Sequence, residues 1–309
     1  MSARPGSTPA AGHGIMSGRT RTPLTAGGPR RAGGSVETQR FITPSFEVSE
    51  VCGLVYGTGS VGNPASGTRE LLLDLHLPAG PGSGGRRPAL VVLHGGGFTG
   101  GSRDNPGPAS LCRAYAGRGY VAASIDYRLA GDDPTGGPGS TPGATVIERT
   151  VNAAVRDAAK AVRWLRTNAD RYRIDPDRIA VAGSSAGAVA ALLMANERPE
   201  VVGDGARVGA IVDLWGGMYG GESLVVAGAP PVFIAHGTGD DTVPMEASQT
   251  LVARLEAAGV PHRFVAIERC GHPCWTGFFT TLLDGRTVDR HCAEFLYEHL
   301  RLAGLNGRR

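Results

Sequence analysis

Short apolar runs alternate with helical patterns along most of this chain. The apolar runs predict strands, and they cover residues 70–77, 89–94, 120–126, 178–183, 209–214, 232–236 and 263–267. Helical spacing occurs between them at 145–169, 188–194, 247–258 and 288–300. The first of these helices carries on one face Val151, Val155, Ala158, Ala159, Val162 and Leu165. Strands that alternate with helices predict an α/β fold, with a mainly parallel sheet covered by helices on both faces.

A single domain is expected for residues 41–309, because a chain of 309 residues can bury one sizeable core. Residues 1–40 are rich in Gly, Pro, Ser, Thr and Arg without hydrophobic periodicity, which predicts a disordered N-terminal tail. Only about seventeen residues, 215–231, separate two of the expected strands, too few for a large cap domain. Cover over a site would therefore come from residues 131–145 or 41–65.

Composition and charge give no indication of a nucleic-acid partner or of a membrane span. The formal net charge is only +3, and no basic stripe interleaved with aromatic residues indicates a nucleic-acid partner. No run approaches the ~18 apolar residues that a membrane span needs. Arg30-Arg31 resembles a twin-arginine signal only superficially, because polar residues follow it. We expect a cytoplasmic protein, with secretion left open, no nucleic-acid partner and no membrane span; the oligomeric state is not indicated.

The pentapeptide G-S-S-A-G at residues 183–187 joins the strand expected at 178–183 to the helical segment at 188–194. This is the pattern G-x-S-x-G in the strand-to-helix context of a nucleophile elbow. Ser185 would then occupy a sharp, strained turn that small neighbours make possible. A Gly/Ser-rich loop without chemistry is the alternative, and the flanking strand and helix favour the nucleophile. Asp175-Pro176 is expected to break the chain just before this strand.

A second glycine-rich turn, H-G-G-G-F at residues 94–98, follows the strand expected at 89–94. Backbone without Cβ atoms can aim successive amides into one concavity and bind an oxyanion, provided that a further amide comes from the residue after the nucleophile, here Ala186. A phosphate-binding loop is excluded, because neither Gly-Lys-Ser/Thr nor G-x-G-x-x-G is present. We expect His94 to organise this loop and not to act as a base.

A serine nucleophile needs a base, and the base needs an acid that orients it. Asp240 and Asp241 follow the strand expected at 232–236, and His272 follows the strand expected at 263–267. The chain order serine, aspartate, histidine differs from the two common protease orders. All these residues fall at the carboxyl ends of strands, where open α/β sheets place their ligands. The candidate triad is therefore Ser185, one of the two aspartates, and His272.

From about residue 71 to 300 the chain resembles the α/β-hydrolase superfamily of esterases and lipases, close to the hormone-sensitive-lipase-like and feruloyl-esterase-like carboxylesterases. The motifs that carry the resemblance occur in order as H-G-G-G-F at 94–98, D-Y-R-L at 126–129, G-S-S-A-G at 183–187, H-G-T-x-D-x-x-V-P at 236–244, and G-H at 271–272. Each motif is moderately specific, and all five in order are a strong signal.

The resemblance implies a role for each candidate residue. Ser185 would be the nucleophile and His272 the general base. The acid falls on Asp240 by counting back from the V-P pair at 243–244, although Asp241 stands beside it. The oxyanion-hole amides would be those of Gly96, Gly97 and Ala186.

The function implied by the resemblance is hydrolysis of a small-molecule carboxylic ester through an acyl-enzyme on Ser185, without a cofactor or a metal. A peptidase or acyltransferase with the same triad is the alternative, and a non-catalytic ligand receptor on a hydrolase scaffold is a third possibility. A zinc site at Cys270-x-His272-x-Cys274 is not expected, because the spacing is unusual and a fourth ligand is not evident.

Cysteine and aromatic residues surround the expected histidine loop. A bridge from Cys274 to Cys270 or to Cys292 would stiffen the loop and argue for an oxidising compartment. We favour the alternative, in which reduced cysteines pack as small apolar residues. Six large side chains could line an apolar pocket, although core packing explains each of them at least as well: Trp215, Met218, Tyr219, Trp275, Phe278 and Phe279.

Overall fold

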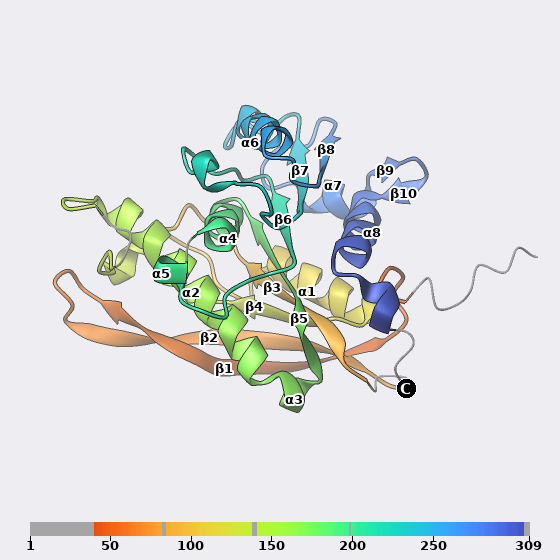
Figure 1. The fold of residues 1–309 in the computed structure, drawn as a ribbon, viewed down its shortest axis with the longest axis horizontal. Helices are drawn as coiled ribbons and strands as arrows, with labels where there is room; N and C mark the ends of the chain where they lie inside the picture. Colours follow the sequence, from red (N-terminus) through yellow and green to blue (C-terminus); the bar gives the residue numbers. More distant parts are fainter. Residues whose placement is uncertain (1–39, 82–84, 138–140, 198, 306–309) are drawn as a thin grey trace, which may run out of the picture. The chain divides into compact units, whose positions relative to one another are not determined.

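The computed structural model describes residues 40–81, 85–137, 141–197 and 199–305. The segment through residue 39, where we predict a disordered tail, lies outside the described residues. The described residues form an eight-stranded sheet in the order β1-β2-β4-β3-β5-β6-β7-β8 (Figure 1). Its strands are β1 (Glu47–Val61), β2 (Gly67–Ala79), β3 (Arg87–Leu93), β4 (Val121–Ile125), β5 (Ile174–Ser184), β6 (Ala210–Leu214), β7 (Val232–Gly237) and β8 (His262–Ile267).

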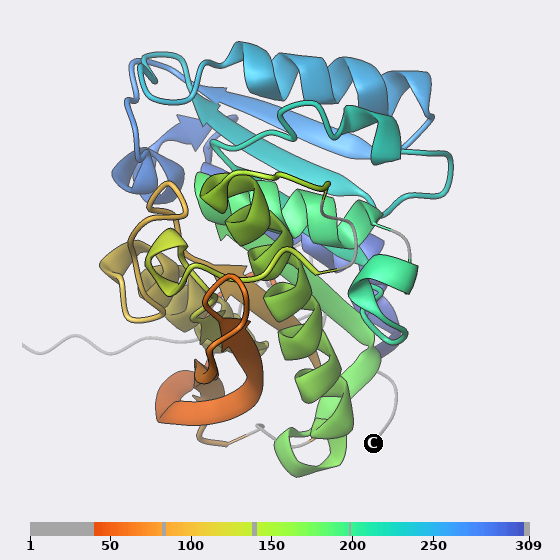
Figure 2. The same ribbon diagram turned by 90° about the vertical axis from the view of Figure 1, so that its left-hand side faces the viewer.

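The sheet is parallel from β4 to β8, and helices cover both of its faces. In β3, Val91 and Leu93 enter a core beneath α2 (Val146–Thr167), α4 (Ala186–Asn196) and α6 (Glu246–Ala257). Leu90 and Val92, on the opposite face, enter a core beneath α1 (Pro106–Arg118) and α8 (Val288–His299). Figure 2 shows α2 and α4 side by side on one face. The predicted α/β architecture is confirmed.

Helix α2 begins with side chains that cap its first turn. The hydroxyl of Thr145 accepts a hydrogen bond from the amide of Glu148, and the Glu148 carboxylate accepts one from the amide of Thr145. This capping box satisfies amides that the first helical turn leaves without partners. The face predicted to be apolar then packs on the sheet, with Val155, Val162 and Leu165 buried.

Residues 41–65, one of the two segments expected to provide cover, instead form mostly β1. This strand lies at the edge of the sheet and pairs antiparallel with β2. Only Tyr56 and Gly59 are buried along its length, so β1 lacks the apolar run that marks the central strands. Between β6 and β7 the described chain forms a short 3₁₀ turn, Glu222–Leu224, and no cap domain.

The expected break at Asp175-Pro176 is wrong, because β5 already begins at Ile174. The pairing of β5 with β3 is irregular here: Ile174 lies opposite Arg87, and the regular register resumes at Ile179 opposite Ala89. Pro176 falls inside this irregularity, where a proline removes no ladder hydrogen bond. In the described ranges, no helix has the length and apolarity to cross a membrane.

Candidate active site

Ser185 lies in a strained turn between β5 and α4. Its backbone angles are φ 53° and ψ −124°, outside the regions that non-glycine residues normally occupy. A Cβ atom on Gly183 would overlap the carbonyl group of Gly187, and one on Gly187 would overlap the carbonyl oxygen of His94. Both glycines are therefore needed for strand and helix to meet closely enough to expose the Ser185 side chain.

A chain of hydrogen bonds joins three of the predicted site residues. The Ser185 hydroxyl lies 3.0 Å from Nε2 of His272, and Nδ1 of His272 lies 2.8 Å from Oδ2 of Asp240. These residues follow β5, β8 and β7, so they meet at the carboxyl ends of parallel strands. Asp241 is exposed, and its carboxylate lies 3.5 Å from the hydroxyl of Thr242. The structure brings Asp240, and not Asp241, to His272.

The carboxylate of Asp240 is held by donors on both oxygens. Its Oδ1 accepts hydrogen bonds from the amides of Thr242, at 3.0 Å, and Val243, at 2.8 Å. Burial opposes its ionisation, but the hydrogen bonds from Val243 and His272 outweigh burial and hold its pKa below the usual value. The group is therefore an ionised acceptor that can fix the orientation of the His272 ring.

The loop after β3 turns sharply beside Ser185. Gly96 and Gly97 have φ of 124° and 60°, and the carbonyl oxygen of Gly96 accepts hydrogen bonds from the amides of Thr99 and Gly100. In the described part of the chain, the amides of Gly96, Gly97 and Ala186 donate none of the backbone hydrogen bonds of turns and loops. These amides are available to a bound anion.

His94 anchors the same loop from below. Its ring is buried and stacks on the Tyr127 ring with centroids 4.3 Å apart, and the Tyr127 hydroxyl donates to the His94 carbonyl oxygen. Burial lowers the pKa of His94, while its hydrogen bond to the carbonyl of Gly95 acts in the opposite direction. The ring is therefore placed to support the loop, as expected. Among the described residues, the Ser185 hydroxyl is hydrogen-bonded to His272 and not to His94.

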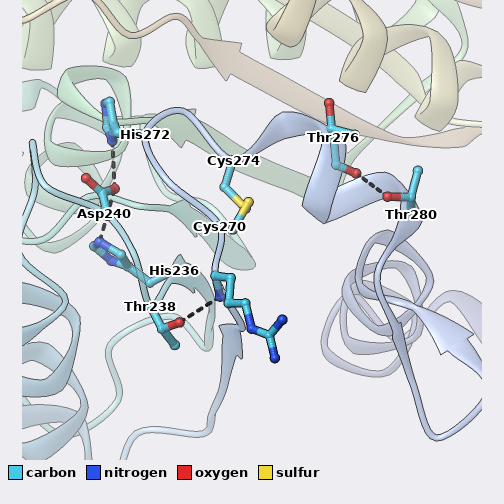
Figure 3. The surroundings of a disulfide bond; sticks show 9 residues. His236, Thr238, Asp240, Cys270, His272, Cys274, Thr276 and Thr280 are labelled. Atoms are coloured by element: carbon cyan, nitrogen blue, oxygen red, sulfur yellow. Dashed lines mark hydrogen bonds and ion pairs between the residues drawn. A yellow bond between two sulfur atoms is a disulfide. The ribbon is translucent and has the colours of Figure 1, made fainter.

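The site contains one further histidine, His236, which the sequence analysis named only as the first residue of a motif. His236, the second-last residue of β7, is fully buried, and its Nε2 lies 3.4 Å from Oδ2 of Asp240. Figure 3 shows Asp240 between the rings of His236 and His272. The sequence signal was present: a histidine ends an apolar strand four residues before the acid. The hydrophobic pattern could not reveal the direction of its ring.

The large apolar side chains near His272 divide between core and surface. Trp215, Met218 and Phe278 are buried in the core, whereas Trp275 and Phe279 are partly buried and Tyr219 is 62% exposed. The Trp215 and Trp275 rings meet edge to face at 5.0 Å. Partial burial, with the charges of Asp213 and Asp240, raises the pKa of Tyr219. Core packing accounts for the first three side chains, and Tyr219 is the most open to a ligand.

The expectation of reduced cysteines around His272 is wrong in this structure. Cys270 and Cys274 form a disulfide, with their Cα atoms 5.6 Å apart (Figure 3). Cys292 is a free thiol buried in α8. The loop over residues 270–274 folds back on itself so that its two ends meet, a closure that sequence spacing alone cannot reveal. The bridge encloses His272 in a very small loop.

We expect reduction of this bridge to lower the free energy of unfolding by about 2 kcal/mol, a small value because the closed loop is short. The measurement is denaturant unfolding with and without a dithiol reductant, in a Cys52→Ser background that removes the exposed free thiol. Alkylation of the denatured, unreduced wild type should label three of its five cysteines. Labelling of all five before reduction would contradict the bridge.

A buried carboxyl group lies directly beneath the turn at Ser185. Asp213 of β6 pairs with Gly183 of β5, and its Oδ1 accepts a hydrogen bond from the amide of Gly216 at 2.9 Å. Its Oδ2 has no hydrogen-bond partner in the described part of the chain. Burial raises the pKa of Asp213 to about 7, although the Gly216 amide acts in the opposite direction. The group is therefore protonated in the folded protein through most of the acidic range.

This raised pKa predicts a pH-dependent stability. Between about pH 4 and 7, Asp213 is ionised in the unfolded chain but protonated in the folded chain. The contribution of Asp213 to the free energy of unfolding is therefore fully present at low pH and is lost as the pH rises through 7. Relative to Asp213→Asn, the wild type should lose about 4 kcal/mol of unfolding free energy over that interval. Urea unfolding of both proteins at several pH values measures this difference. A difference that is independent of pH would contradict the raised pKa.

A groove of about 1730 Å³ lies away from this site. Its walls include Asp175 near the start of β5 and residues just before β6, β7 and β8, such as Gly209, Pro231 and Pro261. It therefore lies at the amino ends of the strands, opposite Ser185. Arg178 is already paired with Asp175. Among the described residues, no group of His, Cys, Asp or Glu side chains could hold a metal ion.

Comparison with known proteins agrees with this geometry. The family model BD-FAE matches residues 73–217. The chain is 31% identical over 230 residues to the Mycobacterium tuberculosis protein named "Uncharacterized protein Rv2307c", covering 70% of this chain and 72% of that protein. It is 36% identical over 117 residues to carboxylesterase NlhH of the same species, covering 38% of this chain and 31% of NlhH.

A solved structure extends the similarity over most of the fold. Esterase 2 of Thermogutta terrifontis superposes with a TM-score of 0.60 at 26% identity, covering 82% of this chain and 92% of that one. Several of the similar proteins are esterases by name, and the fold superposes on a solved esterase over most of its length. The chain belongs to the α/β-hydrolase superfamily of esterases and lipases, and it is a carboxylic-ester hydrolase.

Proposed function

We propose that this protein hydrolyses small carboxylic esters through an acyl-enzyme formed on Ser185. His272 takes the Ser185 proton as the hydroxyl attacks the ester carbonyl carbon, and then gives it to the departing alcohol. Asp240 holds the ring in the tautomer that leaves Nε2 free to accept, and stabilises the imidazolium. The observation that carries the proposal is the pair of hydrogen bonds made by the His272 ring: Nε2 lies 3.0 Å from the Ser185 hydroxyl, and Nδ1 lies 2.8 Å from Oδ2 of Asp240.

The oxyanion that forms during attack would be bound by the amides of Gly96, Gly97 and Ala186. The unpaired amides of the glycine turn and of the first residue of α4 support this assignment. The amino end of α4 adds its dipole, which favours negative charge at that position. Deacylation repeats the cycle with water, which His272 activates in place of the serine hydroxyl.

We propose short acyl chains as the preferred substrates. The similar esterase from Thermogutta terrifontis has been solved with propionate and with butyrate bound. A panel of p-nitrophenyl esters of graded acyl length, with Ser185→Ala as the control, tests both the reaction and the preference. We expect activity on acetate to butyrate esters that falls with longer chains. Turnover of an aminoacyl anilide with no ester turnover would instead indicate a peptidase.

The oxyanion hole can be tested at Gly97. Its φ of 60° is unfavourable for a β-branched residue, while a Cβ atom there would meet only the Thr99 hydroxyl, at 3.8 Å. Gly97→Val should therefore distort the turn without a steric clash and remove about 2–4 kcal/mol of transition-state stabilisation. Steady-state kinetics on the best p-nitrophenyl ester measure this as a fall in kcat with KM nearly constant. A sharp rise in KM at unchanged kcat would make this turn a binding loop.

The compartment in which the protein works is also part of the proposal. Disulfides persist mainly in oxidising compartments. We favour an oxidising compartment on the strength of the Cys270–Cys274 bridge. The alkylation experiment above, applied to protein isolated from its native cells without reductant, tests this directly.

A further inference from the structure

His236 connects three elements around the acid of the site. It lies at the end of β7 with no exposed surface. Nδ1 of its ring lies 2.7 Å from the hydroxyl of Ser248 on α6, which is also buried. Nε2 lies 2.9 Å from the carbonyl oxygen of Val243, in the loop that carries Asp240. One ring therefore ties the strand, the helix and the loop together.

The partners of His236 define its tautomer. The carbonyl oxygen of Val243 can only accept a hydrogen bond, so Nε2 must carry a proton. The Ser248 hydroxyl can donate to an unprotonated Nδ1, which satisfies both ring nitrogens without a buried charge. The Nε2 proton also faces Oδ2 of Asp240 at 3.4 Å, the same oxygen that accepts from His272.

This arrangement limits how the Asp240 carboxylate can rotate. Two backbone amides hold Oδ1, and two imidazole rings flank Oδ2 on different sides. If the loop moved or the carboxylate turned, Oδ2 would leave its position 2.8 Å from Nδ1 of His272, and the His272 ring would no longer be held toward Ser185. Misplacement of a reacting group by about 1 Å can lower a rate by about 100-fold.

We propose that His236 is a positioning residue, whose Nε2–H fixes the Asp240 loop so that Oδ2 stays directed at His272. This inference rests on the proposed function, because it assigns His236 an effect that passes through the acid of the triad. His236 itself does not touch the reacting atoms.

Two substitutions distinguish the contribution of Nε2 of His236 from that of Nδ1. The side-chain amide of His236→Gln can place a donor near the position of Nε2, whereas His236→Asn reaches only the position of Nδ1 and leaves Val243 and Asp240 without their donor. We expect His236→Asn to lower kcat about 10- to 100-fold with KM within about threefold, and His236→Gln to retain most of the activity. Ser248→Ala keeps the His236 ring but removes the hydrogen-bond partner of its Nδ1, and it should lower kcat by an intermediate factor.

A matched control comes from the next strand. His262 lies at the start of β8, where its Nδ1 faces the carbonyl oxygen of Val260, remote from the carboxyl ends of the strands. His262→Asn should leave kcat within about twofold of wild type. The fraction of active enzyme in each preparation, titrated with an organophosphate, corrects for misfolded protein. Equal losses of kcat in His236→Gln and His236→Asn at full active fraction would overturn the inference.

The decisive measurement is a double-mutant cycle with Asp240→Ala. If His236 acts through Asp240, His236→Asn should change kcat by less than about twofold once the carboxylate is gone. If its full effect persists in the Asp240→Ala background, the role of His236 is merely structural and the inference is wrong, while the triad stands. If Asp240→Ala alone leaves kcat unchanged, the proposed triad itself fails, and the inference fails with it for that separate reason.

Discussion

Ser185→Ala and His272→Ala should each reduce ester turnover by roughly 10⁴- to 10⁶-fold, and the double variant should lose little more. The reason is that nucleophile and base act as one unit, joined by the 3.0 Å hydrogen bond between them, so removing the second partner takes away nothing that the first had left. Activity that remains would come from the oxyanion hole and from substrate binding. The measurement is kcat on the best p-nitrophenyl ester for the two single variants and the double variant.

Folding must be controlled in this comparison, because Ser185 is strained. Alanine at the same backbone angles retains the strain, so the unfolding free energy of Ser185→Ala should lie close to that of the wild type. Retention of most of the activity by either single variant, or losses that add in the double variant, would remove Ser185 and His272 from the proposed mechanism.

Asp240→Asn should lower kcat by at least about a hundredfold, whereas Asp241→Asn should lower it by less than about tenfold. Asparagine at position 240 can present an amide N–H to His272 and so favour the wrong tautomer of the ring. The exposed carboxylate of Asp241 makes no hydrogen bond to His272 and contributes only a field that solvent and salt screen. Steady-state kinetics of both variants at low and high salt measure the two effects.

These adjacent residues serve as each other's control, since they share one loop and one type of substitution. The reverse ranking would transfer the role of acid to Asp241. Modest and equal losses would mean that the acid lies elsewhere in the chain.

The parts of this fold that the sequence predicted are those with strong local signals. The central strands read as apolar runs because both of their faces are buried, as the two sets of neighbours around β3 show. Helix α2 was predicted from its apolar face, and the structure adds a capping box at its first turn. The turn at Ser185 was recognisable because few residues other than glycine fit where strand and helix meet.

The features that escaped prediction depend on contacts between distant segments. Strand β1 shows no apolar run, since at the sheet edge only Tyr56 and Gly59 are covered. Helix α1 begins with prolines and has buried residues on most of its circumference, so its period is weak. The choice between Asp240 and Asp241 was a matter of counting until the loop geometry showed which carboxylate faces His272. The positions of His236 and of the Cys270–Cys274 bridge likewise come only from the folded loops.

The most direct test of the central claim is to identify the residue that becomes covalently modified. The wild type, Ser185→Ala and His272→Ala are incubated with paraoxon, and the proteins are digested and mapped by mass spectrometry. We expect one diethyl phosphoryl group per wild-type chain, on the peptide that contains Ser185, with complete loss of esterase activity. Labelling should be much slower in His272→Ala and absent in Ser185→Ala. Stoichiometric labelling of another residue, or inhibition of a still active Ser185→Ala, would contradict the account.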